Sequence, residues 1–450
     1  MTTETQNTHT VAVIGAGPAG LFAARELANA GVRVALLNRD IRPGGLAEYG
    51  IYYDKYKMKL GLRRQFQEIL AMPGIDYFGN VTVGTDTGLS LDDLREMGFQ
   101  ALVVTVGAQG TKWLGLPGED LQGVYHAKDI VYHYNDLPPF SAMEFHIGRR
   151  VALIGVGNVM MDIAHWTVHD LKVDEVIAVA RRGPTEVKFT KKEMQNVGAN
   201  LDLDDLDSEI ARVADRMKAV DQDPQSAREF ILSGTRKAME PVSDTKFRFR
   251  FLSSPCRIIG DDQGRVVGLE VEDTKLVLKN GVTKARGLGT KPILDVDTVV
   301  FCIGDRVDDN FGLPIQWNAF VKNPEPQYPV DEVSFEAYDH EADAPIEGVF
   351  VAGWSREASS GLVGVARKDG ERGAQATLKY LETLPAPTDP ALPVDLLRQT
   401  LDQSGKPYVT NEQVTRLDEF ECAEAGQRGV EIYKLKTNQE MLDCLTRMNS

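Results

Sequence analysis

The sequence has few cysteines and no long apolar run. Its four cysteines are scattered and include no C-x-x-C pair; they are Cys256, Cys302, Cys422 and Cys444. This spacing opposes a disulfide framework, a zinc site or a dithiol redox centre built from this chain, so we expect reduced thiols and no metal site. No stretch reaches the roughly 20 apolar residues that a membrane span needs, so we expect no membrane association.

Positive charge is also in deficit. The 66 acidic residues outnumber the 50 Lys and Arg, which gives a formal charge of −16. Such a chain is a poor candidate for general nucleic-acid binding. A local basic patch can still dock an acidic partner, and eight cations could form one: Lys188, Lys191, Lys192, Arg236, Lys237, Lys246, Arg248 and Arg250. The polar start, residues 1–10, has no apolar signal region, and we expect a cytoplasmic protein.

The chain contains two copies of a strand–helix–strand pattern. An apolar run at 11–14 precedes a helical pattern at 19–30 and a second run at 32–37; apolar runs at 151–154 and 176–180 flank another helix. At 450 residues the chain is long enough for two or three domains. We predict an α/β fold with two Rossmann-like dinucleotide-binding domains.

A glycine-rich turn follows the first apolar run. In such a turn the first glycine permits the tight bend, the second lets the backbone approach a pyrophosphate, and the third allows close helix packing. Asn38 stands where an acid commonly binds a ribose hydroxyl, and it can accept one hydrogen bond without charge. We interpret the site as one for FAD, with contacts from Gly15, Gly17, Pro18, Ala19, Gly20 and Asn38.

The second turn favours NADP(H). Met160 replaces the third glycine, which is common in NADP sites, and Arg181-Arg182 follows the next strand, where an NAD site has an acid. Guanidinium groups match the oxygens of the NADP 2′-phosphate. We predict contacts from Gly155, Gly157, Asn158, Val159, Arg181 and Arg182.

Other glycine-rich segments suit the flavin ring. The segment with Gly45, Leu46, Tyr49 and Gly50 lets the backbone approach a flat ring, although a simple loop explains these glycines as well. A second segment carries Gly353 and Trp354, then Gly361, Leu362 and Val363. Its indole can stack on a ring, and its later turn can donate N–H groups to the flavin carbonyl edge. A Trp at a strand end is otherwise a common core residue.

Two apolar strands that end in glycine, the first at Gly107, are typical of crossings between such domains. We predict an NADP domain inserted in an FAD domain. The expected bounds are 1–115 and 331–450 for FAD, 116–330 for NADP, 201–243 for a helical insertion and 391–450 for an α-rich appendage.

Together these residues resemble the adrenodoxin reductase family, including its bacterial ferredoxin–NADP reductases. The string continues with Phe189-Thr190, Lys192-Glu193, Phe251-Leu252-Ser253-Ser254-Pro255 and Lys368-x-Gly370, and it covers nearly the whole chain. The resemblance implies that Glu193 lines the NADP site, that Trp354 lies along the flavin ring, and that Asp162 lies close to the junction of flavin and nicotinamide. Lys55 stands where the family typically has a histidine near the flavin, and we include it among the catalytic candidates.

The resemblance implies hydride transfer from NADPH to FAD and then single-electron transfer to a ferredoxin-like iron–sulfur protein, by a monomer or homodimer. One alternative is an electron-input subunit like the glutamate synthase small subunit, although no cysteine precedes Cys256 to form an iron–sulfur region. Another is a non-catalytic NADP-binding sensor. A disulfide reductase is disfavoured because no redox cysteine pair is present.

Overall fold

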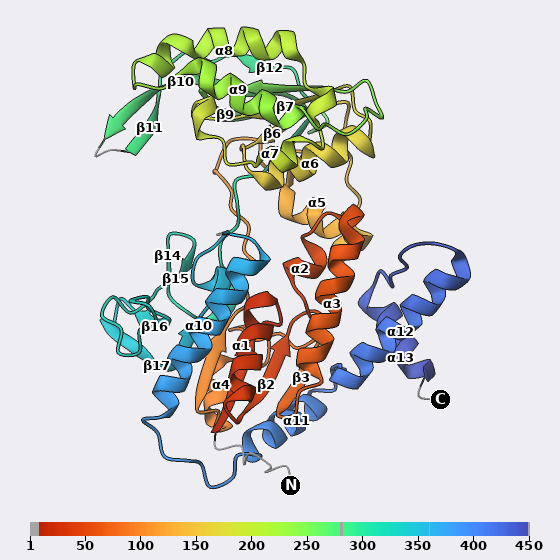
Figure 1. The fold of residues 1–450 in the computed structure, drawn as a ribbon, viewed down its shortest axis with the longest axis vertical. Coiled ribbons are helices and arrows are strands. Elements are labelled where there is room, and N and C mark those ends of the chain that lie inside the picture. The colour runs from red at the N-terminus through yellow and green to blue at the C-terminus, as the bar shows by residue number, and fades with distance from the viewer. Residues whose placement is uncertain (1–8, 280–281, 360, 449–450) are drawn as a thin grey trace. The chain divides into compact units, whose positions relative to one another are not determined.

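The computed structural model describes residues 9–279, 282–359 and 361–448 (Figure 1). The chain forms two compact units. Unit 1 comprises 1–111, 132–142 and 304–450, and unit 2 comprises 112–131 and 143–303. Each unit contains a parallel sheet with helices, and the chain of unit 2 lies between segments of unit 1. The predicted fold class is confirmed.

Unit 1 is built on a six-stranded sheet. All neighbouring strands are parallel except the pair at one edge, β16 and β17. In spatial order the strands are β16 (Glu336–Asp339), β17 (Ala344–Val351), β4 (Ala101–Val104), β1 (His9–Ile14), β2 (Val32–Asn38) and β3 (Ile75–Gly79). A two-stranded hairpin, β14 (Ile315–Gln316) and β15 (Ala319–Phe320), belongs to the same unit.

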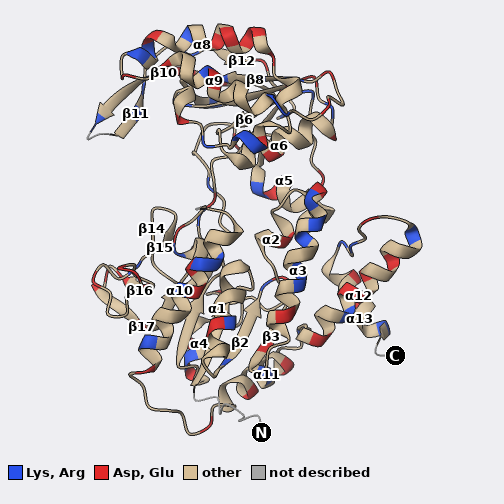
Figure 2. Cartoon of the chain, in the orientation of Figure 1, with Lys and Arg blue, Asp and Glu red and all other residues tan. Residues whose placement is uncertain are grey.

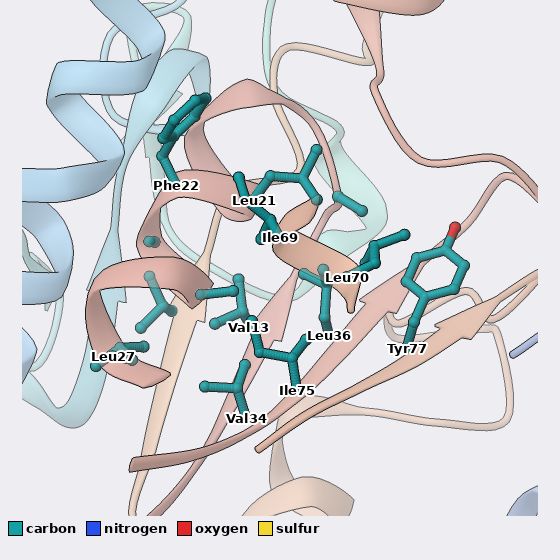
Figure 3. Packing of buried hydrophobic residues seen from close by; sticks show 14 of the residues in the cluster. Val13, Leu21, Phe22, Leu27, Val34, Leu36, Ile69, Leu70, Ile75 and Tyr77 are labelled. Carbon is teal, nitrogen blue, oxygen red and sulfur yellow. The ribbon is translucent and has the colours of Figure 1, made fainter. Parts of the chain in front are cut away.

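Both faces of this sheet are covered, because alternate residues of β1 enter different cores. Val11 and Val13 pack with the first core, while Ala12 and Ile14 pack with the second. Figure 3 shows part of the first core, where Leu21 and Phe22 lie over Val13. This face is covered by α1 (Pro18–Asn29), α3 (Tyr56–Leu70), α10 (Val363–Leu381), α12 (Asn411–Arg428) and α13 (Asn438–Met448); the other by α4 (Leu91–Glu96) and α11 (Leu392–Ser404).

Unit 2 is built on a five-stranded parallel sheet. Its strands, in spatial order, are β5 (Val124–His126), β13 (Thr298–Phe301), β6 (Arg150–Ile154), β7 (Glu175–Val179) and β8 (Lys246–Arg250). A second, antiparallel sheet packs on it through a shared core; it contains β9 (Ser253–Gly260), β10 (Val266–Lys279), β11 (Val282–Gly287) and β12 (Ile293–Leu294). The strand–helix–strand pattern does not indicate this sheet.

The helices of unit 2 are α6 (Asn158–His169), α7 (Lys191–Met194), α8 (Leu203–Lys218) and α9 (Pro224–Thr235). The last two form the helical segment expected at 201–243, and three helices lie within 391–450. Short elements complete the chain: α2 (Leu46–Tyr49), α5 (Ala127–Tyr134) and the 3-10 turns η1 (Tyr53–Lys55), η2 (Phe140–Ala142), η3 (Pro184–Glu186), η4 (Gly198–Asn200), η5 (Asp309–Phe311) and η6 (Gly353–Ser355).

The division of the chain differs from the expected bounds in three ways. The first segment of unit 1 ends at Thr111 rather than at residue 115. Unit 1 resumes at Gly304 rather than at residue 331, and 132–142 also belongs to unit 1. The reason is packing: Phe311, Leu313 and Phe320 join the second core of unit 1. Among the described residues, no helix is both long and apolar enough to span a bilayer.

Candidate functional site

In unit 1 the predicted FAD residues lie where four parallel strands end together. Ile14 pairs with Val104, Val104 pairs with Val351, and Ile14 pairs with Leu37 on the other side. Open parallel sheets bind ligands at this carboxyl edge. The loops after β1, β2, β4 and β17 therefore form one candidate site.

The three glycines of the first turn have different steric surroundings. Gly15 has φ +105°, and a Cβ on it would lie 2.5 Å from the carbonyl oxygen of Thr105. A Cβ on Gly20 would lie 1.8 Å from the carbonyl oxygen of Gly15, whereas one on Gly17 meets no described atom within 4 Å. The first and third glycines thus permit the turn and the helix packing. The second leaves open space at the start of α1, which fits a bound pyrophosphate.

The side chain of Asn38, at the end of β2, forms hydrogen bonds that hold this turn in place. Its side chain is buried; Oδ1 accepts a hydrogen bond from the Ala16 N–H at 3.0 Å, and Nδ2 donates to the carbonyls of Asp40 (2.8 Å) and Arg42 (3.0 Å). An acid could not make the two donor bonds. The structure therefore gives Asn38 a structural role, and its contact with a ribose stays a prediction.

The segment at Gly45 lies against the same turn. The N–H of Gly44 donates to the carbonyl of Ala16 at 2.7 Å, and a Cβ on Gly45 would lie 3.1 Å from the Cα of Gly17. Both glycines have positive φ, +114° and +49°. Leu46 and Tyr49 follow in α2, Tyr49 is 2% exposed, and Gly50 ends the helix. This segment is therefore part of the site's wall.

Gly353 and Trp354 reach the turn from η6. A Cβ on Gly353 would lie 2.6 Å from the Cβ of Ala19, so close packing requires glycine here. The N–H of Gly353 donates to Asp369 Oδ2 at 2.6 Å, and the N–H of Gly107 donates to Ser355 Oγ at 2.9 Å. The segments at Gly15, Gly45, Gly107 and Gly353, which were predicted separately, thus meet at the carboxyl edge of this sheet. Sequence reasoning missed Asp369 and Ser355, although Asp369 lies inside the Lys368-x-Gly370 motif.

Helix α10 begins beside this loop, with its first turn open. Leu362 is the N-cap residue, makes no side-chain cap hydrogen bond and is 73% exposed; Gly361 precedes it with φ +73°. The N–H of Val365 donates to the Leu362 carbonyl at 2.9 Å. Those of Val363 and Gly364 have no partner within the helix. They form the array of donors that the sequence led us to expect.

Lys55 lies in η1, directly before α3, and is half-buried. It is in unit 1, as is Trp354, whereas Asp162 lies on α6 of unit 2. A shared catalytic role for these three residues stays a prediction.

The wall of the site at α2 contains a cluster of buried ion pairs that the sequence did not lead us to predict. Glu48 in α2 is 3% exposed and pairs with Arg63 of α3 and, at 2.7 Å, with Lys434. Burial raises the pKa of Glu48, but Lys434 and Arg63 outweigh burial and hold it well below its usual value. Lys59 is also buried and donates to Asn135 Oδ1. No local pattern marks these residues, because each charge is paired by a segment distant in sequence.

In unit 2 the second turn repeats the same steric pattern. Gly155 has φ +125°, and its Cβ would lie 2.4 Å from the carbonyl oxygen of Cys302. A Cβ on Gly157 meets nothing within 4 Å in the described part of the chain. Asn158 begins α6, and its Oδ1 accepts the Thr190 N–H at 2.9 Å; Val159 beside it is 43% exposed. The open space at Gly157 fits a second pyrophosphate.

Arg181 and Arg182 follow β7 at the carboxyl edge of this sheet. Arg181 is exposed and Arg182 half-buried, and neither guanidinium has an ion-pair or hydrogen-bond partner among the described residues. Their backbone is held in place: the carbonyl of Arg181 accepts Thr274 Oγ1 at 2.8 Å, and that of Arg182 accepts the Leu252 N–H at 3.1 Å. Two free guanidiniums on an anchored backbone suit a phosphate ligand.

Glu193 lies nearby in α7, a helix capped by Thr190, whose Oγ1 accepts the Glu193 N–H at 3.3 Å. Since Thr190 is also held by Asn158, the structure connects Glu193 to the turn. Asp162 is one turn further along α6 and is half-buried.

The sequence also suggested a basic docking patch in unit 2, and this prediction is partly wrong. The eight cations were Lys188, Lys191, Lys192, Arg236, Lys237, Lys246, Arg248 and Arg250. Arg248 pairs with Glu175 and with Asp202 at 2.8 Å, and Arg250 pairs with Glu209 at 2.9 Å. These two charges are neutralised within the unit.

The four cysteines are all described, and none forms a disulfide. Cys256 and Cys302 belong to unit 2, and Cys422 and Cys444 to unit 1. The thiols therefore supply no dithiol centre at either glycine turn.

Known proteins resemble the chain along nearly its whole length. The NADPH-ferredoxin reductase FprA of Mycobacterium leprae is 27% identical and matches 96% of this chain and 98% of its own. The mitochondrial NADPH:adrenodoxin oxidoreductase of Homo sapiens is 27% identical and matches 98% of this chain and 92% of its own. The structure of Mycobacterium tuberculosis FprA in complex with NADPH superposes with a TM-score of 0.81 at 26% identity, covering 98% of this chain and 100% of that one.

These matches confirm the predicted resemblance to adrenodoxin reductases and bacterial ferredoxin reductases. The family model described as pyridine nucleotide-disulphide oxidoreductase matches residues 9–335, which include both glycine turns. The chain therefore belongs to the pyridine nucleotide-disulphide oxidoreductase family.

Proposed function

We propose that the chain is an FAD-dependent oxidoreductase that takes electrons from NADPH and passes them singly to a ferredoxin-like iron–sulfur protein. The observation that carries this proposal is the repeated glycine turn with open space at Gly17 and Gly157. Beside the second turn, Arg181 and Arg182 have no side-chain partner among the described residues. The named relatives are NADPH-ferredoxin and NADPH:adrenodoxin reductases. We assign FAD to unit 1 and NADPH to unit 2.

The residues of unit 1 would bind FAD and shape its surroundings. The start of α1 faces the pyrophosphate with free N–H groups and the positive end of its dipole. Gly45 and Gly353 let their segments pack against the turn that would hold the pyrophosphate, and the first turn of α10 would offer N–H donors where negative charge develops on the ring. When bound, FAD accepts two electrons with a hydride and releases them one at a time, which couples NADPH to a one-electron carrier.

The residues of unit 2 would bind and orient NADPH. Arg181 and Arg182 distinguish NADPH from NADH because only NADPH carries a 2′-phosphate. Asn158 holds Thr190 and thus the segment leading to Glu193 in place beside the turn. No residue of the chain needs to act as a nucleophile. A cytoplasmic location is part of this proposal, to be checked by cell fractionation.

Anaerobic titration tests the proposal. Purified protein should carry one FAD per chain, be bleached by NADPH, and reduce an added ferredoxin; a panel should include ferredoxins, flavodoxins and disulfide substrates. A colourless protein, or bleaching without transfer to any iron–sulfur protein, would contradict it. Gel filtration of a native extract separates this enzyme from the alternative, an electron-input subunit of a larger complex.

A further inference from the structure

The antiparallel sheet of unit 2 continues as a two-stranded ribbon. The first part of β10 pairs with β9 and β12, but its last residues, from Thr274 to Lys279, pair with β11. Figure 1 shows this ribbon projecting from the rest of unit 2. Apart from Thr274 and Leu276, the described side chains of the ribbon are half-buried or exposed, so they contribute little to a core and are available for another purpose.

The register places four cations on one side of the ribbon. Directly paired residues of an antiparallel ladder point to the same face, and residues two apart share that face. The pairs are Lys275 with Arg286, Val277 with Lys284, and Lys279 with Val282. The opposite face carries Leu276, Leu278, Thr283 and Ala285. We call the first side the cationic face; it consists of Lys275, Val277, Lys279, Val282, Lys284 and Arg286.

The charges of this face are unpaired. Lys275, Lys279, Lys284 and Arg286 are all exposed, and across 9–279, 282–359 and 361–448 none has an ion-pair or hydrogen-bond partner. Asp273, the next residue of β10 on this side, forms an ion pair with Arg212 at 3.0 Å. Figure 2 shows Lys and Arg, and no Asp or Glu, along β11.

This arrangement opposes the stability of the ribbon itself. Lys275 lies directly opposite Arg286, and like charges at paired positions destabilise an antiparallel ladder. The chain as a whole carries a charge of −16, so an unpaired cationic face runs against its composition. A role in folding does not account for the face, whereas a role in binding an anionic partner does.

The chemistry of the face favours a protein as the partner. The three pairs extend over about 14 Å of strand, and Val277 and Val282 lie between the cations. Val282 is 56% exposed. Apolar side chains among charges suit an interface that combines carboxylates with small apolar patches. A phosphate polymer would use the cations alone, and the acidic chain would repel it.

We propose that the cationic face of the β10–β11 ribbon docks an acidic surface of the electron-accepting protein. This inference rests on the proposed function, since it assigns a binding surface to the acceptor. The face adds to the rate and affinity of the encounter through charge and takes no part in electron transfer from NADPH to FAD. It replaces the larger basic patch that the sequence suggested.

A charge-reversal pair with a matched control tests this assignment in the full-length holoenzyme. The test variant is Lys279→Glu/Lys284→Glu. The control is Lys172→Glu/Lys218→Glu, which makes the same change of net charge at two exposed lysines elsewhere in unit 2. The probes are an acidic [2Fe–2S] ferredoxin and, as an acceptor that needs no docking, ferricyanide.

We expect the test variant to raise the KM for ferredoxin about tenfold at low ionic strength, and about twofold at 0.3 M salt. The rate with ferricyanide and the KM for NADPH should not change, and the control should alter the KM for ferredoxin less than twofold. Equal effects in both variants, or none in the test variant, would overturn the proposal. A raised KM for NADPH would assign the cations to the nucleotide site instead.

Two further outcomes would each overturn the docking proposal for a different reason. If the unmodified enzyme reduces ferricyanide but no ferredoxin, the proposed function itself fails, and the docking proposal fails with it. If the test variant loses binding to vesicles containing anionic lipid but keeps its KM for ferredoxin, the face belongs to a membrane surface and the docking proposal is overturned.

Discussion

Arg181 and Arg182 illustrate how a charge can be kept available for a ligand. Elsewhere in unit 2, Arg212, Arg248 and Arg250 are each paired with carboxylates, whereas these two guanidiniums are free within the described chain. Hydrogen bonds between charged groups contribute about 1.5–3 kcal/mol each. Most of that energy is gained only when a phosphate is bound.

Replacing either arginine should therefore lower the affinity for NADPH and leave the affinity for NADH nearly unchanged. Arg181→Ala and Arg182→Ala are each expected to raise the KM for NADPH by about tenfold to a hundredfold and to leave the KM for NADH nearly unchanged. Steady-state kinetics with ferricyanide measures both. Arg228→Ala, at a surface ion pair with Asp207, is the control. An equal loss with both nucleotides would contradict the assignment to the 2′-phosphate.

Lys59 is a buried amine with an altered proton affinity. Burial, together with the nearby charge of Lys434, lowers its pKa to about 7, against an unfolded value of 10.5; Arg63 adds to the lowering, while Glu48 and Asp136 oppose it. Between these two pH values the unfolded chain binds a proton that the folded chain does not. The free energy of unfolding therefore rises with pH in this window, and the contribution is constant below about pH 7.

The altered pKa of Lys59 predicts a measurable slope when the free energy of unfolding is plotted against pH. The contribution of Lys59 to the free energy of unfolding should grow by up to about 1.4 kcal/mol per pH unit from neutral pH toward pH 10. Lys59→Met should remove that part of the slope. Urea denaturation of both proteins, followed by circular dichroism at several pH values, measures it. If the free energy of unfolding changes with pH in the same way in both proteins, Lys59 does not have an altered pKa.

At the scale of elements, the two strand–turn–helix units were predictable because their chemistry is local. The strand at 151–154, the glycine turn and the helix from Asn158 are consecutive in the sequence, and each has its own pattern. The antiparallel sheet was not predicted. Strands β9, β10 and β11 follow one another through short connections, and the Asn-Gly at 280–281 is a hairpin signal that the prediction did not use. The outer half of β10 places the apolar run 276–278 between Lys275 and Lys279.

The first turn gives a paired test of steric roles. In Gly17→Ala the new methyl enters open space and the φ of −76° suits alanine, so the fold should be kept while FAD binding is lost. In Gly20→Ala the methyl would lie 1.8 Å from the carbonyl oxygen of Gly15, so α1 must move away from β1. We expect a loss of about 3 kcal/mol or more of stability.

Flavin absorbance per chain and thermal unfolding separate the two effects. Gly17→Ala should purify colourless with an unfolding temperature like that of the apoprotein, and Gly20→Ala should unfold at a lower temperature. Full FAD content in Gly17→Ala would show that the open space does not receive the pyrophosphate.

At the scale of the whole molecule, the last segment of the chain completes the surroundings of the first. Lys434 pairs with Glu48, and Arg42 pairs with Asp418 and, at 2.9 Å, with Glu421. Glu48 and Arg42 are buried, and removing Lys434 leaves Glu48 with only Arg63 as a cationic partner among the described residues. The sequence led us to expect only an α-rich appendage at 391–450, but in the structure its residue Lys434 pairs with Glu48 of α2 and supports this wall of the site.

Lys434→Met should therefore destabilise unit 1 by about 3 kcal/mol. The pKa of Glu48 then rises, so the variant should lose stability at a higher pH than the unmodified protein as acid is added. Glu48→Gln/Lys434→Met should recover only part of the loss, since Arg63 then lacks its carboxylate partner. Lys436→Met, at a 3.5 Å surface pair with Asp136, should cost less than about 1 kcal/mol. Equal effects at the two lysines would contradict this role.

The sequence alone determined the two dinucleotide folds, their order and the preference for NADPH, because a glycine turn and an arginine pair act through short stretches of chain. Only the tertiary structure decided which charges are free and which are paired. Arg250 and Arg181 look alike in the sequence, yet one is held by Glu209 and the other has no described partner. The same holds for Asn38 and for the cations of the ribbon, because their hydrogen-bond and ion-pair partners, or the lack of them among the described residues, depend on folding.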